Sequence, residues 1–442
     1  MLTRRSLLGG ATVIAAAAGV TACTSAPPAV GPSASPPGSG AAPALDPADW
    51  ASVRAQFALP AELADLATFV FASHPASVRA AIQRHREGLD RGAVRYLGEF
   101  EQQLDDAVLA AAAAYLATKP EQIALTDSTT MGLGLLYGGL TLRAGDEIVQ
   151  TEHDFYSTDE ALRLRAARDG VRVRKIRVYD DPAAAQPADI VARVKAAVTP
   201  STRVVAVTWV HSSTGVKLPI RAIADMLATI NGPRPAEQRV LLCVDGVHGF
   251  GAENATPDEL GCDFLVSGTH KWLFGPRGTG LVWGREEAWE RYAPVIPSFA
   301  YGSIGPWIMG TAATASPGAA ATPGGYHSFE HRWALAEAFE LHRAITRARV
   351  AERTHQLASR LKQGLTATGK VRVRTPDSPD RSAGIVCCEV DGVDPRAAVN
   401  QLWQAKVLAS VTPYRTEYLR FGTSILNSEA DVDAAVAAVA AL

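Results

Sequence analysis

The sequence has no surplus of either charge and few cysteines. Its 442 residues carry 43 Lys and Arg against 45 Asp and Glu, a formal net charge of −2. With no basic surplus to hold a phosphate backbone, nucleic-acid binding is not expected. The five cysteines are Cys23, Cys243, Cys262, Cys387 and Cys388. They form no CxxC pair and no spacing suited to zinc, so we expect neither a metal site nor a disulfide framework.

A hydrophobic run long enough for a confident membrane span is also lacking. The N-terminal apolar stretch, residues 6–22, is too short. It follows Arg4 and Arg5 and leads into Val-Thr-Ala-Cys, which ends at Cys23. Paired arginines before such a run resemble a twin-arginine export signal, and the second motif resembles a lipobox with an acylated cysteine. The alternative is a disordered tail in which these residues occur by chance.

This N-terminal pattern predicts a signal over residues 1–23 and export by the twin-arginine route. We expect a location in the cell envelope or periplasm, with a lipid anchor to the membrane at Cys23. Residues 24–45 are rich in Pro, Gly, Ser and Ala, which indicates a disordered linker.

The body of the chain predicts an α/β fold. From about residue 100 to 290, helical patterns alternate with short apolar runs rich in β-branched residues. These runs cover 147–150, 171–178, 203–210, 239–245 and 263–268. Nearly continuous apolar strands between helices favour a mostly parallel sheet covered on both faces.

A smaller α+β domain is expected at the C-terminus. A long helical pattern covers 329–366, another helix lies near 394–405, and a helix at 428–441 closes the chain. The predicted organisation after the linker is an N-terminal segment at 46–75, a large domain at 76–328 and a small domain at 329–442.

The strongest local signal is SGTHKWLFGPRGTGLVW, residues 267–283. It indicates a strand end, a polar turn with Lys271 and a glycine-rich return into another strand. Ligands of α/β sheets gather at the carboxyl ends of strands. A partly desolvated lysine there has a lowered pKa and can form an imine with an aldehyde cofactor. Taken alone, a single lysine such as Lys271 is more often a solvated loop lysine.

An acidic residue ends another predicted strand. Asp245 closes the run 239–245, and His248 follows shortly after. A carboxylate that faces a pyridine ring keeps the ring nitrogen protonated and makes the ring an electron sink. His248 would then lie beside the ring's phenolic oxygen, unless it is a structural histidine.

A hydroxyl-rich turn precedes the apolar helix within LTDSTTMGLGLL, residues 125–136. The free N–H groups and dipole of a helix start favour a phosphate. Thr129 and Thr130 are the candidate ligands. An ordinary N-cap, formed by Ser128 or Thr129, would explain the same residues.

With these pieces in order, the chain resembles the class V aminotransferase family over roughly residues 65–440. The motifs are GDEIV (145–149), EHDFYS (152–157), SSTG (212–215), VDGVHGFG (244–251), SGTHKWLFGPRG (267–278) and LRFGTSILNSEADVD (419–433). The resemblance implies a fold-type I enzyme that uses pyridoxal 5′-phosphate (PLP).

It also implies roles for individual residues. Lys271 would form the Schiff base with PLP, and Asp245 would bind the pyridine nitrogen. Around the phosphate it places Thr129, Thr130, Ser267 and His270. Near the phenolic oxygen it places Ser212 and His248. For the side chain that stacks on the ring, it gives His153 as first choice and Phe155 as second.

The substrate side of the site is implied in the same way. Arg420 would bind the α-carboxylate of an amino-acid-like small molecule, and a surface arginine is the alternative. His74 is a candidate substrate contact. Residues 322–333 occupy the region from which relatives send a loop into the neighbouring subunit's site, which implies a homodimer with shared active sites.

The motifs look closest to the isopenicillin N epimerase-like branch, which makes an epimerase-like reaction the first expectation. An epimerase needs a second proton donor besides Lys271, and His153, Tyr156 or His327 could supply it. Transamination and β-elimination by a cysteine C–S lyase are the alternatives.

A cysteine desulfurase and a protein without catalytic activity are two further alternatives. Residues 409–418 hold no cysteine, so the nucleophile of a cysteine desulfurase is missing there and that activity is disfavoured. A catalytically inactive, exported binding lipoprotein that kept the fold is the alternative of another class.

Overall fold

The computed structural model describes residues 43–442. The predicted signal, Cys23 and most of the predicted linker lie outside the described residues. Within residues 43–442, none of the helices is both long and apolar enough to cross a membrane.

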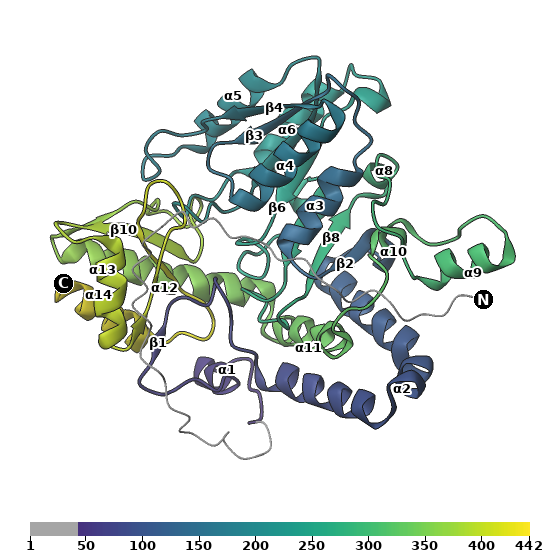
Figure 1. The fold of residues 1–442 in the computed structure, drawn as a ribbon. Helices are drawn as coiled ribbons and strands as arrows, with labels where there is room; N and C mark the ends of the chain where they lie inside the picture. The colour runs from purple at the N-terminus through teal and green to yellow at the C-terminus, as the bar shows by residue number, and fades with distance from the viewer. Residues whose placement is uncertain (1–42) are drawn as a thin grey trace, which may run out of the picture. The chain divides into compact units, whose positions relative to one another are not determined.

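A seven-stranded sheet in the order β2-β8-β7-β6-β5-β3-β4 forms the centre (Figure 1). Its strands are β2 (Ile123–Thr126), β3 (Glu147–Thr151), β4 (Arg172–Ile176), β5 (Thr202–Thr208), β6 (Leu241–Asp245), β7 (Phe264–Gly268) and β8 (Gly280–Gly284). Strands β3 to β7 pair in parallel, and β8 runs against its neighbours β7 and β2. The predicted α/β fold with a mostly parallel sheet is confirmed.

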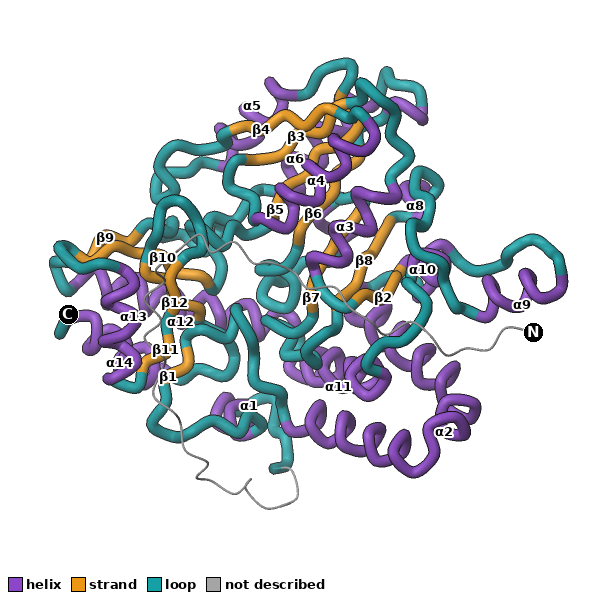
Figure 2. The backbone as a smooth tube through the Cα atoms, viewed as in Figure 1, coloured by secondary structure: helices purple, strands orange, loops and turns teal. Residues whose placement is uncertain are grey.

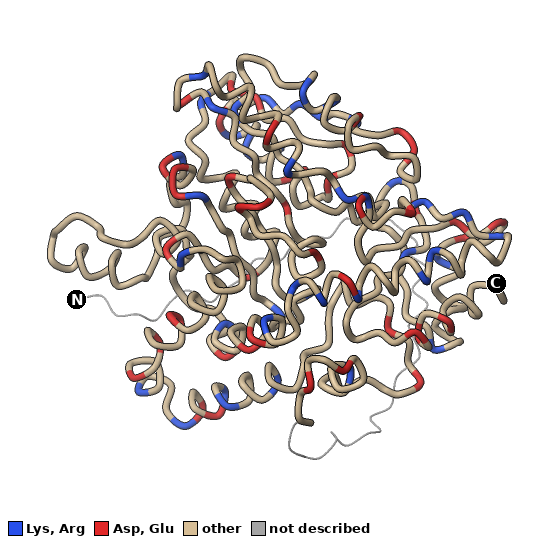
Figure 3. Tube along the Cα trace, turned by 180° about the vertical axis from the view of Figure 1, so that it is seen from behind, with Lys and Arg blue, Asp and Glu red and all other residues tan. Residues whose placement is uncertain are grey.

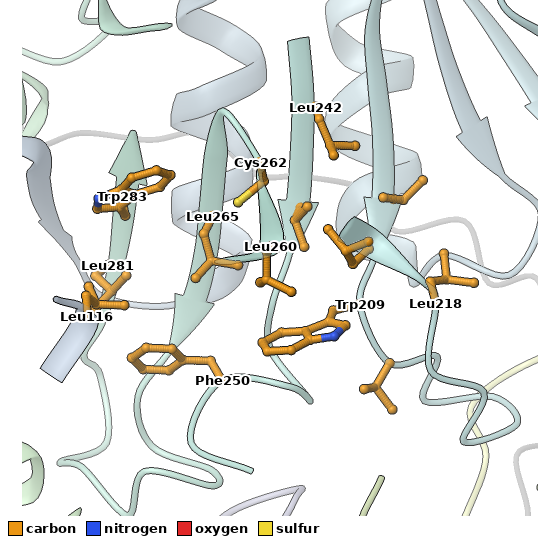
Figure 4. Packing of buried hydrophobic residues seen from close by; sticks show 14 of the residues in the cluster. Leu116, Trp209, Leu218, Leu242, Phe250, Leu260, Cys262, Leu265, Leu281 and Trp283 are labelled. Atoms are coloured by element: carbon orange, nitrogen blue, oxygen red, sulfur yellow. The ribbon is translucent and has the colours of Figure 1, made fainter. Parts of the chain in front are cut away.

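Helices cover both faces of this sheet because its strands are apolar on both sides. Successive residues of β5 show this: Val205 and Val207 belong to one buried cluster, and Val204 and Ala206 belong to the other. Figure 4 shows the first cluster, in which Trp209 lies below Leu260. The helices of this part are α2 (Ala76–Leu116), α3 (Thr129–Gly139), α4 (Tyr156–Asp169), α5 (Pro187–Ala197), α6 (Ile220–Asn231), α7 (Pro257–Leu260), α8 (Glu286–Trp289), α9 (Tyr301–Met309) and α10 (Pro317–Ala321), with 3-10 turns η1 (Pro120–Gln122) and η2 (Ala236–Gln238).

The C-terminal part has an antiparallel sheet of its own, in the order β12-β13-β10-β9 (Figure 2). Its strands are β9 (Val371–Val373), β10 (Ile385–Val390), β12 (Ser410–Val411) and β13 (Leu419–Gly422). Helices α12 (Arg347–Ala367), α13 (Pro395–Gln404) and α14 (Glu429–Ala440) supply apolar residues to the core beneath it.

The long helical pattern 329–366 proves to be two helices. The first, α11 (Phe329–Ile345), ends at Thr346, where φ is 76° in the left-handed region, and α12 follows at once. The Thr346 hydroxyl accepts from the Arg349 backbone N–H at 3.4 Å and caps the second helix. The apolar periodicity continues through this break, so the pattern could not reveal it.

The N-terminal segment packs against the C-terminal part of the chain. Helix α1 (Trp50–Ala55) is followed by β1 (Ala64–Asp65), which pairs in parallel with β11 (Val407–Leu408). Figure 1 shows β1 beside the C-terminal helices. The Gly422 N–H also donates to the Leu66 carbonyl at 2.7 Å. These contacts hold residues 69–71 close to the strand that carries Arg420. The predicted domain boundaries stay a prediction.

The segment between Arg291 and Glu330 contains no Lys, Arg, Asp or Glu. It includes α9, which extends away from the neighbouring helices and is drawn without charged residues in Figure 3. Its most exposed large apolar side chains are Phe299, Tyr301, Trp307, Ile308, Met309 and Tyr326.

Candidate active site

A cavity of about 490 Å³ opens at the carboxyl ends of the central strands. Thr208 and Asp245, the last residues of β5 and β6, both line it. The predicted site residues in its lining are Lys271, Asp245, His248, Thr129, Thr130, Ser212, His270, Phe155 and Arg420. Two predicted cofactor-binding residues, His153 and Ser267, do not line it. Its volume lies in the range of small-molecule sites, about 300–1,000 Å³.

Lys271 lies in the turn between β7 and β8. The Phe274 N–H donates to the Lys271 carbonyl at 3.1 Å, and the Gly275 N–H donates to Thr269 at 2.8 Å, which fixes the turn. Burial lowers the pKa of Lys271 to about 8, an effect that the Asp245 carboxylate opposes and the Arg420 charge reinforces. This lowered pKa gives a much larger uncharged fraction near neutral pH than an ordinary lysine has, and only the uncharged amine is nucleophilic.

Asp245 is almost fully buried at the end of β6. Its Oδ1 accepts from the Val247 backbone N–H at 3.0 Å. Burial raises the pKa of Asp245 to about 6, although this hydrogen bond and the Lys271 charge lower it. A buried carboxylate is stable only beside a positive partner, and a protonated ring nitrogen is such a partner.

The start of α3 forms a polar end of the cavity. Ser128 caps the helix, since its hydroxyl accepts from the Met131 N–H at 3.1 Å. The predicted N-cap therefore exists, yet it leaves Thr129 and Thr130 for other partners. The Thr129 hydroxyl accepts from the Gly268 N–H at 2.7 Å, and Thr130 contacts Ser157 at 3.0 Å.

This end suits an anion. The His270 Nδ1 is buried and has no hydrogen-bond partner within residues 43–442. A Cβ on Gly268 would lie 2.9 Å from the His270 ring and 3.0 Å from the Thr129 hydroxyl, so only glycine allows this close approach. The hydroxyls, the imidazole and the positive end of the helix dipole together fit a phosphate.

The hydrogen bond from Trp272 defines the protonation of His248. The indole N–H of Trp272 donates to His248 Nδ1 at 3.2 Å. Because an indole nitrogen can only donate, Nδ1 must be the unprotonated nitrogen and Nε2 carries the proton. Burial lowers the pKa of His248 well below its ordinary value, and the Lys271 and Arg420 charges act in the same direction. His248 is therefore a neutral donor, which suits a phenolic oxygen.

Arg420 is held on β13 by two hydrogen bonds. Its Nη1 donates to the Ser212 carbonyl at 3.0 Å, and its Nε donates to the Ser410 hydroxyl at 3.1 Å. Its guanidinium lies 4.6 Å from the centre of the Phe69 ring. The Nη2 group has no hydrogen-bond partner among the described residues, so it remains available to a ligand carboxylate. Arg420 is thus a built part of the site and not a surface arginine.

The turn after β3 places the two candidates for stacking on the cofactor ring, His153 and Phe155, in different surroundings. Asp154 accepts from the backbone N–H groups of Thr151 at 2.7 Å and Thr208 at 2.9 Å. This holds the turn so that His153 stacks on Tyr179, with ring centres 3.8 Å apart and an angle of 12°. His153 does not line the cavity, whereas Phe155 does. The geometry favours Phe155, the second choice, and the assignment stays a prediction.

Other candidates lie outside the cavity lining. Ser267 is fully buried and its hydroxyl donates to the Gly268 carbonyl at 2.8 Å. His74 is buried close to His331. Tyr156 is exposed on α4, and His327 lines a separate small pocket. None of these four contributes to the main cavity in this chain.

Several cavity-lining residues were not predicted from the sequence. Phe69, Val70 and Phe71 come from the N-terminal segment, and Pro413 comes from the loop between β12 and β13. They have no motif of their own. The pairing of β1 with β11 and the hydrogen bond from the Gly422 N–H to the Leu66 carbonyl bring the N-terminal residues to the cavity. Asp127, Ser128, Ser157, Thr208, Val247 and Gly278 complete the lining.

The residues present fit PLP. One amine, one buried acid and one hydroxyl-rich helix start share a single cavity, and the unpartnered His270 nitrogen faces the same end as the threonine hydroxyls. Lys271 would hold the aldehyde carbon, Asp245 the ring nitrogen, and Thr129, Thr130 and His270 the phosphate.

Comparisons with known proteins agree with this geometry. The family model described as "Aminotransferase class-V" matches residues 73–434. Isopenicillin N epimerase of Streptomyces clavuligerus is 26% identical over 333 residues, which cover 73% of this chain and 80% of the epimerase. A probable cysteine desulfurase of Vibrio cholerae is 25% identical over 321 residues, which cover 70% of this chain and 72% of that protein.

Solved structures share the fold. A C-DES mutant with glycine covalently linked to its PLP cofactor has a TM-score of 0.78 at 22% identity, covering 88% of this chain and 98% of that chain. The cystine C-S lyase C-DES in complex with cysteine persulfide has a TM-score of 0.76 at 21% identity, covering 86% and 98%.

Proposed function

Since this chain belongs to the class V aminotransferase family of PLP-dependent enzymes, we propose that it acts at the α-carbon of an amino-acid-like substrate. The observation that carries the proposal is the meeting of Lys271, Asp245 and Arg420 in one cavity. These three side chains can hold the cofactor at both ends of its ring system and hold the substrate by its carboxylate.

When bound, PLP supplies an electron sink for the substrate's α-carbon. The Lys271 amine accepts the α-proton and returns it. Asp245 would hold the protonated ring nitrogen, and the His248 Nε2–H group would donate to the phenolic oxygen. Arg420 binds the substrate carboxylate through its forked N–H groups and thereby orients the α-carbon.

Among the possible reactions, those that need one proton carrier agree best with the geometry. Within one chain, none of the predicted candidates for a second carrier, His153, Tyr156 and His327, lines the cavity. In the proposed homodimer, His327 of the segment 322–333 would lie toward the partner's site. Lys271 alone suffices for transamination or β-elimination. Epimerisation is the second candidate, favoured by the match to 80% of isopenicillin N epimerase.

Amino acids incubated with the holoenzyme in D₂O separate these outcomes. Ketone formation supports transamination, and ammonia with pyruvate supports β-elimination. Exchange at the α-carbon with inversion and neither product supports epimerisation. If no amino acid exchanges its α-proton or changes the cofactor absorbance, the enzyme proposal fails and an inactive binding protein is the better account.

A cysteine desulfurase remains disfavoured in our proposal. Such an enzyme needs a reactive thiol in the site, and none of the four described cysteines lines the cavity. Cys387 is the one paired in register with Arg420, and burial raises the pKa of its thiol to about 12. Absence of alanine formation from L-cysteine under turnover conditions would support this view, because β-elimination gives pyruvate and ammonia instead.

We also propose a homodimer. The uncharged segment with α9 exposes aromatic and aliphatic side chains, and residues 322–333 follow it directly. Large exposed apolar surfaces of this kind mark interfaces. Light scattering should give twice the chain mass, and Trp307→Asp in α9 should shift the protein toward monomer. A wild-type monomer at micromolar concentration would contradict this.

Export and anchoring are proposed from residues 1–23 alone. Arg4-Arg5→Lys-Lys should trap the protein inside the cell. Cys23→Ala should release the exported protein from the membrane fraction. Unchanged fractionation of both variants would refute the signal.

A further inference from the structure

The cavity wall on the substrate side is apolar. The Phe69 ring lies under the Arg420 guanidinium, and Phe69 is itself only 1% exposed. Val70 and Phe71 follow it into the lining. Pro413 lines the cavity and precedes Tyr414, whose hydroxyl contacts Ser212 at 2.7 Å. We call Phe69, Val70, Phe71 and Pro413 the apolar wall.

Among the cavity-lining residues of this chain, none on the apolar wall carries a charge that could bind a substrate side chain. The ionisable residues of the lining are Lys271, Asp245, His248, His270, Arg420 and Asp127. The first five have roles with the cofactor or the α-carboxylate. Asp127 lies in the turn before α3, beside the threonines proposed for the phosphate. A charged substrate group placed on the wall would lose water without gaining a partner, which is costly.

The wall also presents apolar surface that a ligand would cover. The Phe71 side chain is 65% exposed and Val70 is 37% exposed, although both line the cavity. The Phe71 ring stacks on His270, with centres 5.9 Å apart and an angle of 26°, so it is held in place. A preformed apolar face beside a carboxylate-binding arginine selects for an aliphatic or aromatic side chain.

We propose that the substrate is an amino acid with an uncharged, apolar side chain longer than a methyl group, which packs on the apolar wall. This inference rests on the proposed function, because it takes Arg420 as the carboxylate site. The wall residues come from the N-terminal segment and the β12–β13 loop, so the two ends of the fold together determine specificity.

A homologous series of amino acids tests the proposal. The kcat/KM for α-deuterium exchange should rise about fourfold with each added methylene from L-alanine through L-2-aminobutyrate to L-norvaline. L-Aspartate, L-glutamate and L-lysine should exchange no faster than L-alanine. A flat or falling series, or a preference for any of the three charged amino acids, overturns the proposal.

Substitution of Phe71 tests whether the apolar wall causes the preference for longer side chains. Phe71→Ser should flatten the series while the cofactor absorbance stays unchanged. Trp403→Ser on α13 is the matched control, because Trp403 is 49% exposed and does not line the cavity, and it should keep the full slope. If kcat/KM still rises with side-chain length in Phe71→Ser, the apolar wall does not determine the substrate preference.

Failure of the wall and failure of the proposed function are distinguishable. Loss of exchange with every amino acid refutes the enzyme and the wall with it. Exchange that is present but independent of side-chain length refutes the wall alone.

Discussion

Asp245→Asn is expected to make the cofactor-free protein more stable at neutral pH while abolishing its activity. Asparagine keeps the size of the side chain and can still accept the Val247 N–H at the position of Oδ1. It removes a charge that the protein buries almost completely. A residue retained at a cost to stability is typical of a functional site.

The magnitude follows from the pKa of Asp245, which is raised from 3.8 to about 6. That difference corresponds to about 3 kcal/mol. The folded protein retains the proton longer than the unfolded chain does, so it binds more protons between about pH 4 and pH 6. The free energy of unfolding therefore falls as the pH rises through this window. The asparagine side chain does not titrate, so the variant does not lose this part of its free energy of unfolding as the pH rises.

Urea unfolding of the cofactor-free protein, followed by tryptophan fluorescence, measures the difference. The variant should match the wild type at about pH 4 and exceed its free energy of unfolding by about 3 kcal/mol at pH 8. Asp225→Asn, an exposed carboxylate on α6, is the control and should change stability by less than about 1 kcal/mol at any pH. A variant that is less stable at pH 8, or a difference independent of pH, would refute the reasoning.

Three further predictions concern binding and pH. The rate at which the cofactor-free protein captures PLP, followed by absorbance, should rise with pH to a midpoint near 8, because the Lys271 pKa is lowered to about 8 and only the uncharged amine attacks; a midpoint above 10 would show an ordinary lysine. Thr129→Val should weaken PLP binding about tenfold by equilibrium titration, while Thr129→Ser, which keeps the hydroxyl bonded to the Gly268 N–H, should bind almost normally. Arg420→Lys should raise KM for amino acids at least about tenfold without changing the cofactor absorbance, because lysine keeps the charge but loses the forked donor geometry; an unchanged KM would remove Arg420 from the substrate site.

Much of the fold could be predicted because the central strands are buried on both faces. Such strands appear as nearly continuous apolar runs, and each run predicted between residues 147 and 268 overlaps an observed strand. The break at Thr346 could not be predicted, because the apolar periodicity of α11 continues into α12. Helices α9 and α10 lie in a Gly- and Pro-rich segment and give little helical signal.

Candidate site residues could be predicted where they lie at or just beyond the end of a strand or at the start of a helix. Lys271, Asp245 and Thr129 are placed by the strand and helix boundaries around them. The choice between His153 and Phe155 depends on how Asp154 anchors one turn, and local sequence does not determine this. The apolar wall depends on contact between residues near 65 and residues near 408, which lie far apart in the chain.

Chemical trapping of the Schiff base shows whether Lys271 carries the cofactor. The purified holoenzyme is reduced with borohydride, digested and analysed by mass spectrometry for phosphopyridoxyl-lysine. We expect one modified peptide, labelled at Lys271 and lost in Lys271→Ala. A label on another lysine, or a folded protein that takes up no PLP, would contradict it.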